Sequence, residues 1–287
     1  MSIRSDVAQC GVVPHGYRGA MRMGMSVPTF GDFADVRALA DLAATAEAGG
    51  WDGFFVWDHI RWPWADDLVD AWIAMTAIAI ATERIRLGPL VTPLPRRRPA
   101  KVAREAVTLD RLSGGRLILG VGAGDFPEEF SHLGDVDDGR VRAAMLDEAL
   151  TIVDGLWSGA PLTVEGRFYQ VRDVTFKPPP MQRPRIPIWV GGQWPHSAPI
   201  DRALRWDGYA PIKHDLSPTT AADVAAMAAR LDLPSHPGFD LVIYANDDED
   251  VAAYATAGAT WYIDSPAPDD MSLSGMRRRA AAGPPRA

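Results

Sequence analysis

Short apolar runs alternate with amphipathic stretches along most of the chain, and this alternation constrains the fold more than any other feature of the sequence. Continuous apolar strands separated by helices indicate a parallel sheet covered by helices on both faces. Eight such units in 287 residues favour a closed α/β fold, the (β/α)8 barrel, over an open doubly wound sheet. The eight strands are predicted at residues 21–27, 54–57, 85–92, 116–122, 187–192, 207–212, 240–245 and 260–265.

Helical spacing of apolar residues fills the intervals between these strands, and one segment breaks the rhythm. Residues 162–176 (LTVEGRFYQVRDVTF) alternate around a Glu165-Gly166 turn, which predicts an inserted β-hairpin that we expect to border the pocket. No linker divides the chain, so residues 21–287 are predicted to form a single domain after a loosely ordered extension at residues 1–20. The helices are predicted at 35–49, 68–82, 101–112, 142–157, 200–206, 219–231 and 247–257, with a further turn within 276–287.

Composition narrows the class of protein. The formal net charge of -8 gives no general attraction for nucleic acid or an anionic membrane. No run approaches the ~20 apolar residues of a membrane-spanning helix. The single cysteine, Cys10, excludes an internal disulfide framework, and residues 1–20 lack the apolar core of a signal peptide. We therefore expect a cytoplasmic protein that binds neither nucleic acid nor membrane.

A barrel of this type carries its active site at the carboxyl ends of its strands, and the second predicted strand ends in two polar residues. Within FFVWDHIRW (54–62), Asp58 and His59 stand side by side. Asp58 could simply cap the following segment, and His59 could be a structural hydrogen-bonding histidine. An imidazole with a pKa near ~6.5 can accept or release a proton at neutral pH, so His59 is the leading candidate for proton transfer.

Glycines end the fourth and fifth predicted strands. LGVGAGD (119–125) lacks the third glycine of a dinucleotide fingerprint, because Asp125 occupies that position. Its small residues would let a flat ring or polyol chain lie against the backbone, although a tight turn explains them equally well. WVGG (189–192) leads toward a predicted helix, so its N–H groups could bind an anion, with Lys213 supplying positive charge from the next strand end.

Two further observations limit the chemistry. The RRRP stretch (96–99) follows the third strand and is read as solvated surface, as a set of ion pairs, or as a basic patch that steers ligands. The sequence contains no zinc-ligand, serine-hydrolase or nucleotide-phosphate motif of known pattern, and we expect no metal site.

Taken together, the motifs resemble the bacterial luciferase-like monooxygenase family, whose members use FMN or the deazaflavin coenzyme F-420. The family fold is a TIM-like barrel with insertions, which agrees with the eight predicted strands. The likeness runs from about Met21 to the C-terminus, and residues 1–20 match no known pattern. It is strongest in LGPLVTPLPRRRPAKVAREAVTLDRLSGGRLILGVGAG (87–124), with support from GGWDGFFVWDH (49–59), FKPPP (176–180), PIWVGG (187–192), DGYAP (207–211) and AGATWYI (257–263).

The resemblance implies roles for single residues. Asp58 and His59 match the family's acid–histidine pair beside the ring, and Asp125 falls where deazaflavin-using sugar dehydrogenases carry a longer catalytic glutamate. Trp62 and Trp64 would form a substrate wall, unless they serve only packing. The third-strand end, where relatives often carry a non-prolyl cis peptide, would back the ring; the fourth would border the ribityl chain, and the fifth and sixth would grip the phosphate. These cofactor positions are Val91, Thr92, Gly122, Ala123, Gly124, Gly191, Gly192 and Lys213.

Three functions remain open at this point. The leading one is a redox enzyme acting on a small organic substrate, either a monooxygenase with reduced FMN or a hydride-transferring enzyme with F-420, in which His59 donates or accepts a proton. The others are a flavin-binding barrel without turnover and a flavin-independent lyase or hydrolase, which would need paired carboxylates. By analogy with relatives we expect a homodimer with a contribution from the apolar helix 68–82, and a separate reductase where the cofactor must arrive reduced.

Overall fold

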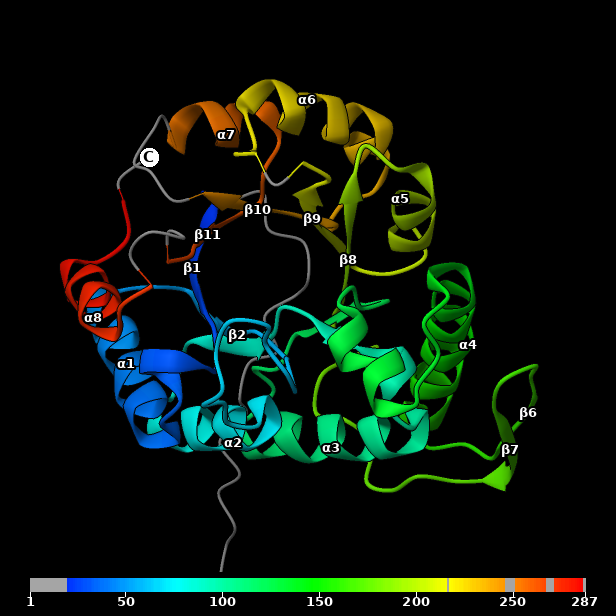
Figure 1. Ribbon diagram of the computed structural model, residues 1–287. Coiled ribbons are helices and arrows are strands. Elements are labelled where there is room, and N and C mark those ends of the chain that lie inside the picture. Colours follow the sequence, from blue (N-terminus) through cyan, green and yellow to red (C-terminus); the bar gives the residue numbers. More distant parts are fainter. Residues whose placement is uncertain (1–19, 216, 246–250, 267–270, 286–287) are drawn as a thin grey trace, which may run out of the picture.

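The structure is a computed structural model that describes residues 20–215, 217–245, 251–266 and 271–285. The predicted extension at residues 1–20 therefore lies, apart from residue 20, outside the described residues. Figure 1 shows strands arranged in a ring with helices α1 to α8 around it. The eight-stranded barrel predicted from the alternation is confirmed, with a ninth, two-residue strand at one edge of the sheet.

All strand pairs in the main sheet are parallel, in the order β3-β2-β1-β11-β10-β9-β8-β5-β4. The ring closes where Ile118 donates its N–H to the carbonyl of Leu87 at 2.8 Å, which links the segment before β5 to β3. The strand bounds are β1 Arg22–Val27, β2 Gly53–Val56, β3 Arg86–Pro89, β4 Thr92–Pro93, β5 Leu119–Gly122, β8 Ile188–Trp194, β9 Gly208–Lys213, β10 Asp240–Ala245 and β11 Trp261–Asp264.

Aspartate side chains cap the beginnings of three helices. Asp35, Asp70 and Asp138 each accept backbone N–H groups of the first turn, which satisfies donors that would otherwise lack a partner. Among the described residues, no helix is both long enough and apolar enough to span a membrane. The helix bounds are α1 Val36–Gly49, α2 Ala71–Ala81, α3 Pro99–Leu112, α4 Gly139–Trp157, α5 Ser197–Ala203, α6 Ala221–Arg230, α7 Val251–Ala257 and α8 Leu273–Ala282.

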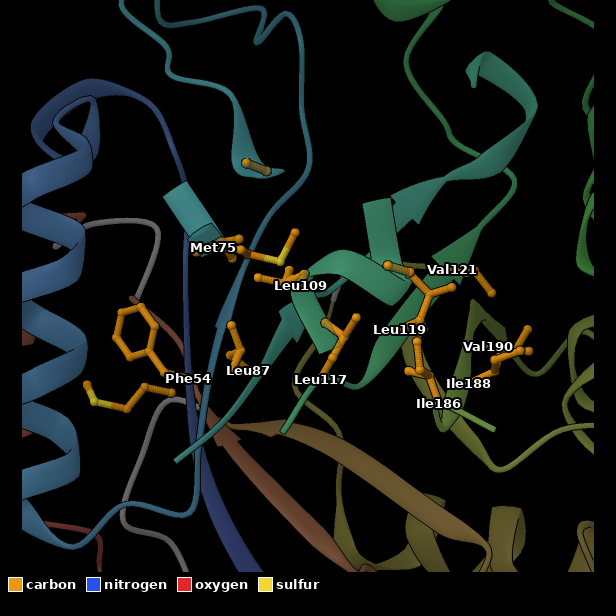
Figure 2. Close-up of a cluster of buried hydrophobic side chains, with 14 of the residues drawn as sticks. Phe54, Met75, Leu87, Leu109, Leu117, Leu119, Val121, Ile186, Ile188 and Val190 are labelled. Atoms are coloured by element: carbon orange, nitrogen blue, oxygen red, sulfur yellow. The ribbon is translucent and has the colours of Figure 1, made fainter. Parts of the chain in front are cut away.

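Alternate residues of each strand divide the core into two layers. The outer layer lies between strands and helices, and Figure 2 shows Phe54 and Leu87 of the strands near Met75 of α2 and Leu109 of α3. The inner layer fills the barrel itself. Its buried members are Phe55, Leu90, Ile118, Trp189, Ala210, Val242, Trp261 and Ile263.

Three aromatic rings of the inner layer, Phe55, Trp189 and Trp261, contact one another with centroids 5.2 to 5.8 Å apart. Neighbouring glycines leave room for them: a Cβ on Gly53 would lie 2.6 Å from the Phe55 ring, and one on Gly208 would lie 2.5 Å from Trp189. The barrel interior is therefore packed with side chains, and a site has room only at the carboxyl ends of the strands, which we call the barrel mouth.

The predicted hairpin exists but lies elsewhere than expected. Strands β6 (Leu162–Glu165) and β7 (Gln170–Val174) pair antiparallel outside the ring of helices (Figure 1). The carboxylate of Glu148 in α4 accepts the N–H groups of Phe168 and Tyr169, at 3.1 and 2.6 Å. Because these bonds fix the hairpin to the outer side of α4, the expectation that it borders the pocket is wrong.

Candidate functional site

Asp58 follows β2 and is buried, with an exposed fraction of 1%. Its carboxylate accepts hydrogen bonds from the Thr92 hydroxyl at 2.7 Å and the Trp72 indole N–H at 3.1 Å. It also pairs with the guanidinium groups of Arg96 and Arg97 at 2.9 and 3.0 Å. Burial by itself would raise the pKa of Asp58, but Arg97, Arg96 and Thr92 together hold this pKa below its usual range. Asp58 therefore stays ionised and joins the ends of β2 and β4.

Glu129 brings a second buried carboxylate to the same place. It ends the short 3₁₀ helix Pro127–Glu129 in the loop after β5 and is 1% exposed. Its Oε1 lies 3.1 Å from Nδ1 of His59 and 3.0 Å from Nη1 of Arg96, and it accepts the N–H of Ile60 at 2.8 Å. Burial by itself would raise the pKa of Glu129, but His59, Arg96 and the Ile60 N–H together lower this pKa by more than burial raises it. The carboxylate is thus charged and faces the imidazole.

This arrangement fixes the chemical role of each histidine nitrogen. With Nδ1 of His59 facing Glu129, Nε2 is the ring atom left to exchange a proton with a ligand. The His59 side chain is 20% exposed, so the imidazole can be reached from the mouth. The charges of Asp58, Glu129, Arg96 and Arg97 sum to zero, and a proton on His59 would add one positive charge beside a carboxylate.

Glu129 was not predicted from the sequence; the acid predicted in the loop after β5 was Asp125, at the position where relatives carry a catalytic glutamate. In the structure Asp125 is exposed, and the structure does not bring it to His59. Its backbone carbonyl instead lies 3.5 Å from Nη2 of Arg142. A signal for Glu129 was present in FPEEF (126–130), because a carboxylate between two phenylalanines is placed to be buried. For RRRP, the ion-pair interpretation is confirmed for Arg96 and Arg97.

Aromatic side chains surround His59. Trp62 stacks on Phe30 with centroids 4.5 Å apart and an interplanar angle of 15°, and it contacts His59 at 4.7 Å and Phe126 at 5.1 Å. Trp64 contacts Trp62 edge-on at 5.6 Å and is 79% exposed. The predicted wall of Trp62 and Trp64 is thus assembled beside His59, with additional members from two other loops. We call this set the aromatic wall: Phe30, Trp57, Trp62, Trp64 and Phe126.

Three of the predicted cofactor positions come together at the mouth. Within the third predicted strand, β3 ends at Pro89 and β4 begins at Thr92, and the peptide between Leu90 and Val91 is cis. The Val91 side chain lies between two strands, since a Cβ on Gly122 would be 2.7 Å from it and one on Gly191 3.0 Å. Val91 thus covers Gly122 and Gly191, and we call these three residues the glycine shelf.

Thr92 and the remaining glycine-loop positions have other neighbours. Thr92 is fully buried and donates its hydroxyl to Asp58, so it holds the acid instead of facing the shelf. Gly124 has a φ of +79°, and a Cβ there would lie 2.2 Å from the Phe130 ring. Ala123 is half-buried beside Gly122. Gly124 therefore serves the turn that folds the 126–130 loop back, which is the alternative considered for it.

The structure does not assemble the expected anion grip. β8 continues past the two glycines to Trp194, and Gly192 pairs in register with Pro211, so the glycines do not end the strand. A Cβ on Gly192 would lie 2.2 Å from Pro199 of α5, on the helix side of the sheet. Lys213 also turns away, with Nζ 3.2 Å from the Asp223 carboxylate of α6. The structure therefore does not bring Gly191, Gly192 and Lys213 together in the way that the predicted phosphate site requires.

Tyr244, near the end of β10, is a residue that the sequence argument did not select. Its strand alternates so that Val242 and Tyr244 face the barrel interior, where Tyr244 packs, like Val91, against the inner layer. Burial raises the pKa of the Tyr244 phenol, which keeps the hydroxyl protonated as a hydrogen-bond donor. Alternation along DLVIYA was the signal that could have found it.

Comparison with known proteins gives one match over nearly the whole chain. A family model described as luciferase-like monooxygenase matches residues 15–285. Among curated proteins, the chain is similar to the F-420-dependent glucose-6-phosphate dehydrogenase of Microbacterium testaceum, with 35% identity over 163 residues that cover 55% of this chain and 47% of that protein. The chain therefore spans about half the length of the curated relatives of this type that it matches.

Solved structures agree on the architecture. The F-420-dependent tetrahydromethanopterin reductase from Methanopyrus kandleri superposes with a TM-score of 0.73 at 15% identity, over 92% of this chain and 99% of that one. The oxygenating constituent of 3,6-diketocamphane monooxygenase from Pseudomonas putida, in complex with FMN, gives a TM-score of 0.66 at 19% identity, over 79% and 67% of the two chains. At these identities the likeness shows a shared fold.

Proposed function

Because the chain belongs to the luciferase-like monooxygenase family, we propose that it is an oxidoreductase whose reaction takes place on a flavin-type ring bound at the barrel mouth. The observation that carries the proposal is the His59–Glu129 pair, in which Nδ1 of His59 lies 3.1 Å from a buried carboxylate. The hydrogen bond between Thr92 and Asp58 ties the two loops together. The bond thereby holds the residues adjacent to Thr92 and Asp58, namely Val91 and His59, at the rim of the barrel mouth.

The residues present fit a flat ring. The glycine shelf offers backbone and a single valine side chain, and a Cβ on Gly122 or Gly191 would press on Val91. A ring lying on this shelf would have the aromatic wall and His59 along its edge. We place F-420 first, because the curated relative named above depends on it, and FMN second, because a protein with the same fold holds it.

Each residue then has a definite task. The bound ring supplies the redox chemistry, as hydride transfer for F-420 or oxygen activation for reduced FMN. His59 moves a proton at Nε2, and Glu129 stabilises the imidazolium that forms. Arg96 bridges Asp58 and Glu129 and so keeps the two loops in register. The aromatic wall keeps water from the reacting atoms, and Tyr244 is available to donate a hydrogen bond from the opposite strands.

The lyase or hydrolase alternative needs a pair of free carboxylates. Of the three acids at the strand ends, Asp125 is exposed, but Asp58 and Asp264 are engaged. Asp58 is paired with two arginines, and Asp264 accepts a hydrogen bond from Arg279 at 2.7 Å. His59→Ala distinguishes the enzyme from a flavin-binding barrel without turnover. In an enzyme this variant would slow the reaction, whereas in a binding protein coenzyme binding would be unchanged and there would be no reaction to slow.

Partners follow from the same proposal. The reaction needs a small organic substrate, and with FMN it also needs a separate reductase that delivers the reduced coenzyme. For a homodimer, α2 offers an apolar face: Ile73 and Ile80 lie seven residues apart on it and are 62% and 71% exposed. We propose that this face contributes to the contact between two copies, which sedimentation of Ile73→Glu would test.

The decisive experiment is a titration of the protein with F-420 and, separately, with FMN. Tryptophan fluorescence reports binding, because Trp57 and Trp62 lie in the aromatic wall. We expect saturable one-to-one binding of F-420 that Gly191→Ala weakens, since its Cβ would press on Val91. Gly139→Ala, at the start of α4, is the matched control, because a Cβ there would meet only Arg142, at 4.0 Å. Binding of neither coenzyme would contradict the proposal.

A further inference from the structure

Trp72 is the second residue of α2, and its buried side chain ends in a polar contact at the barrel mouth. The residue is 6% exposed, and its indole N–H donates to Oδ2 of Asp58 at 3.1 Å. A phenylalanine would fill most of the same space but would have no N–H to donate. A hydrogen bond to an ionised carboxylate is stronger than one between neutral groups, so this contact holds the carboxylate more firmly than packing would.

The donors to Asp58 divide between its two oxygens. Oδ2 accepts from Trp72 and from the Thr92 hydroxyl, at 3.1 and 2.7 Å, and both of these donors are neutral. Oδ1 faces the guanidinium groups of Arg96 and Arg97, at 2.9 and 3.0 Å. The χ2 torsion of an aspartate has a broad range, so its partners determine how the carboxylate is rotated. Because the two neutral donors hold Oδ2, they direct Oδ1 toward Arg96.

Arg96 connects this carboxylate to the second one. Its Nη1 lies 3.0 Å from Oε1 of Glu129, and the Arg96 side chain is 2% exposed. The same Oε1 lies 3.1 Å from Nδ1 of His59. Asp58 and Glu129 are each 1% exposed, so bulk water does not replace a partner that moves. A rotation of the first carboxylate would therefore change the position of the second one beside the imidazole.

The helix that carries Trp72 is fixed at both ends. Asp70 accepts the N–H of Trp72 at 2.9 Å, which caps the first turn. At the other end, Nη2 of Arg116 donates to the carbonyls of Ala79 and Thr82, at 2.9 and 2.8 Å. The two carboxylates of the mouth network lie in segments that follow strand ends, and side chains on a helix hold their positions more precisely than those on loops. Trp72 therefore links the network to a fixed element.

We propose that Trp72 is a positioning residue for His59. Its indole N–H orients Asp58, and the Arg96–Glu129 pair passes this orientation on to Nδ1 of the imidazole. In the neutral ring the proton is thereby kept on Nδ1, which leaves Nε2 open toward a ligand. The inference rests on the proposed function for the proton transfer at Nε2, but the proton on Nδ1 is a property of the protein without coenzyme.

The test is heteronuclear NMR of the protein with isotopically labelled histidine, recorded without coenzyme at a pH at which the imidazole is neutral. His59→Asn identifies the signal of the Nδ1 proton by its loss. We expect Trp72→Phe to make the exchange of this proton with water at least about 3-fold faster, because the carboxylate beside it is held less firmly. Trp157→Phe is the matched control: Trp157 is 2% exposed, and its indole N–H donates to the carbonyl of Ala103 at 3.0 Å, so the variant loses a buried hydrogen bond outside the network.

A second variant tests the same connection from the other end. Coupling between two positions is reciprocal, so Glu129→Gln should make the indole proton of Trp72 exchange faster as well. This result does not depend on whether Trp72→Phe folds. An indole proton that exchanges as in the wild type would show that the two positions are not connected.

The outcomes separate this inference from the proposed function. An unchanged exchange rate in Trp72→Phe, or an equal increase in Trp157→Phe, would overturn the positioning role and leave Trp72 as a packing residue, even if F-420 binds. A wild-type proton found on Nε2 would overturn it too. Faster exchange in Trp72→Phe alone, in a protein that binds neither coenzyme, would support the positioning role and overturn the redox function.

Discussion

Two buried polar networks lie at opposite ends of the same barrel, and they differ in where they stop. At the amino end of the strands, Asp240 accepts hydrogen bonds from Arg22 at 2.7 Å, Trp189 at 3.1 Å and Thr260 at 3.0 Å. The three contacts just named join strands to one another, and none of them involves a histidine. At the mouth, the network of Asp58, Arg96 and Glu129 ends at a partly exposed imidazole. The first arrangement can only stabilise the fold, whereas the second presents a proton carrier to a ligand.

The largest effect should come from the group at the end of the mouth network. His59→Asn removes the proposed proton carrier, so turnover should fall by about 10²- to 10⁴-fold. Thermal unfolding should change little, because His59 is at the rim. Steady-state kinetics together with a melting curve checks this. A variant with normal turnover would show that His59 is not the proton carrier.

The opposite network should respond in the opposite way. Asp240→Asn leaves Arg22 without its carboxylate and should lower the free energy of unfolding by about 1–3 kcal/mol. The exposed part of Arg22 can be solvated, which limits the loss. Coenzyme affinity should stay at the wild-type value. Chemical denaturation measures the stability, and the coenzyme titration measures the affinity. A loss of affinity without a loss of stability would mean that the network at the amino end serves coenzyme binding and not the fold.

The carboxylates of the mouth should contribute to the pH dependence of stability. The pKa values of Asp58 and Glu129 are held below their ordinary values by the arginines and by His59, after burial is overcome. A lowered folded-state pKa gives stability that is present above the unfolded pKa and is lost as the pH falls through the folded one. We therefore expect stability to decline as the pH falls below the ordinary carboxyl range. Glu129→Gln should flatten this decline in denaturation curves recorded across acidic pH; an unchanged slope would rule Glu129 out as a source.

The smallest effect is expected for Lys213, which the sequence predicted to lie in the site but which the structure places against α6. Lys213→Met removes a charge paired with Asp223 on α6, so coenzyme affinity should change by less than about 3-fold. The fluorescence titration decides the matter. A large loss would mean that Lys213 leaves Asp223 when the coenzyme binds and would restore the predicted phosphate grip.

The periodicity of the sequence was sufficient to predict the architecture, and it also located two members of the polar network at the mouth, Asp58 and His59. The strands were predictable because continuous apolar runs recur, and Asp58 and His59 because they directly follow such a run. Glu129 was not, because it approaches Ile60 from 69 positions away and lies in a loop without a repeat. Contacts across such distances are set by the closed sheet, which no local pattern describes.

The length of a strand was the other property that the sequence did not reveal. Two glycines suggested that β8 stops, but Gln193 and Trp194 continue to pair with Ile212 and Lys213. Pairing with β9, and not the residue type at the two glycines, therefore determines where β8 ends. The hairpin was recognisable from its own alternation, whereas its position depended on Glu148 in another element.

The three rings that fill the barrel interior also have a kinetic consequence. Phe55, Trp189 and Trp261 block the route through the barrel, so coenzyme and substrate have to enter and leave by the same opening. The glycine shelf lies between strands, while the aromatic wall stands on the loops above them. On the proposed function, a coenzyme on the shelf and a substrate at the wall would share one entrance, so the presence of one would affect the rate at which the other enters or leaves.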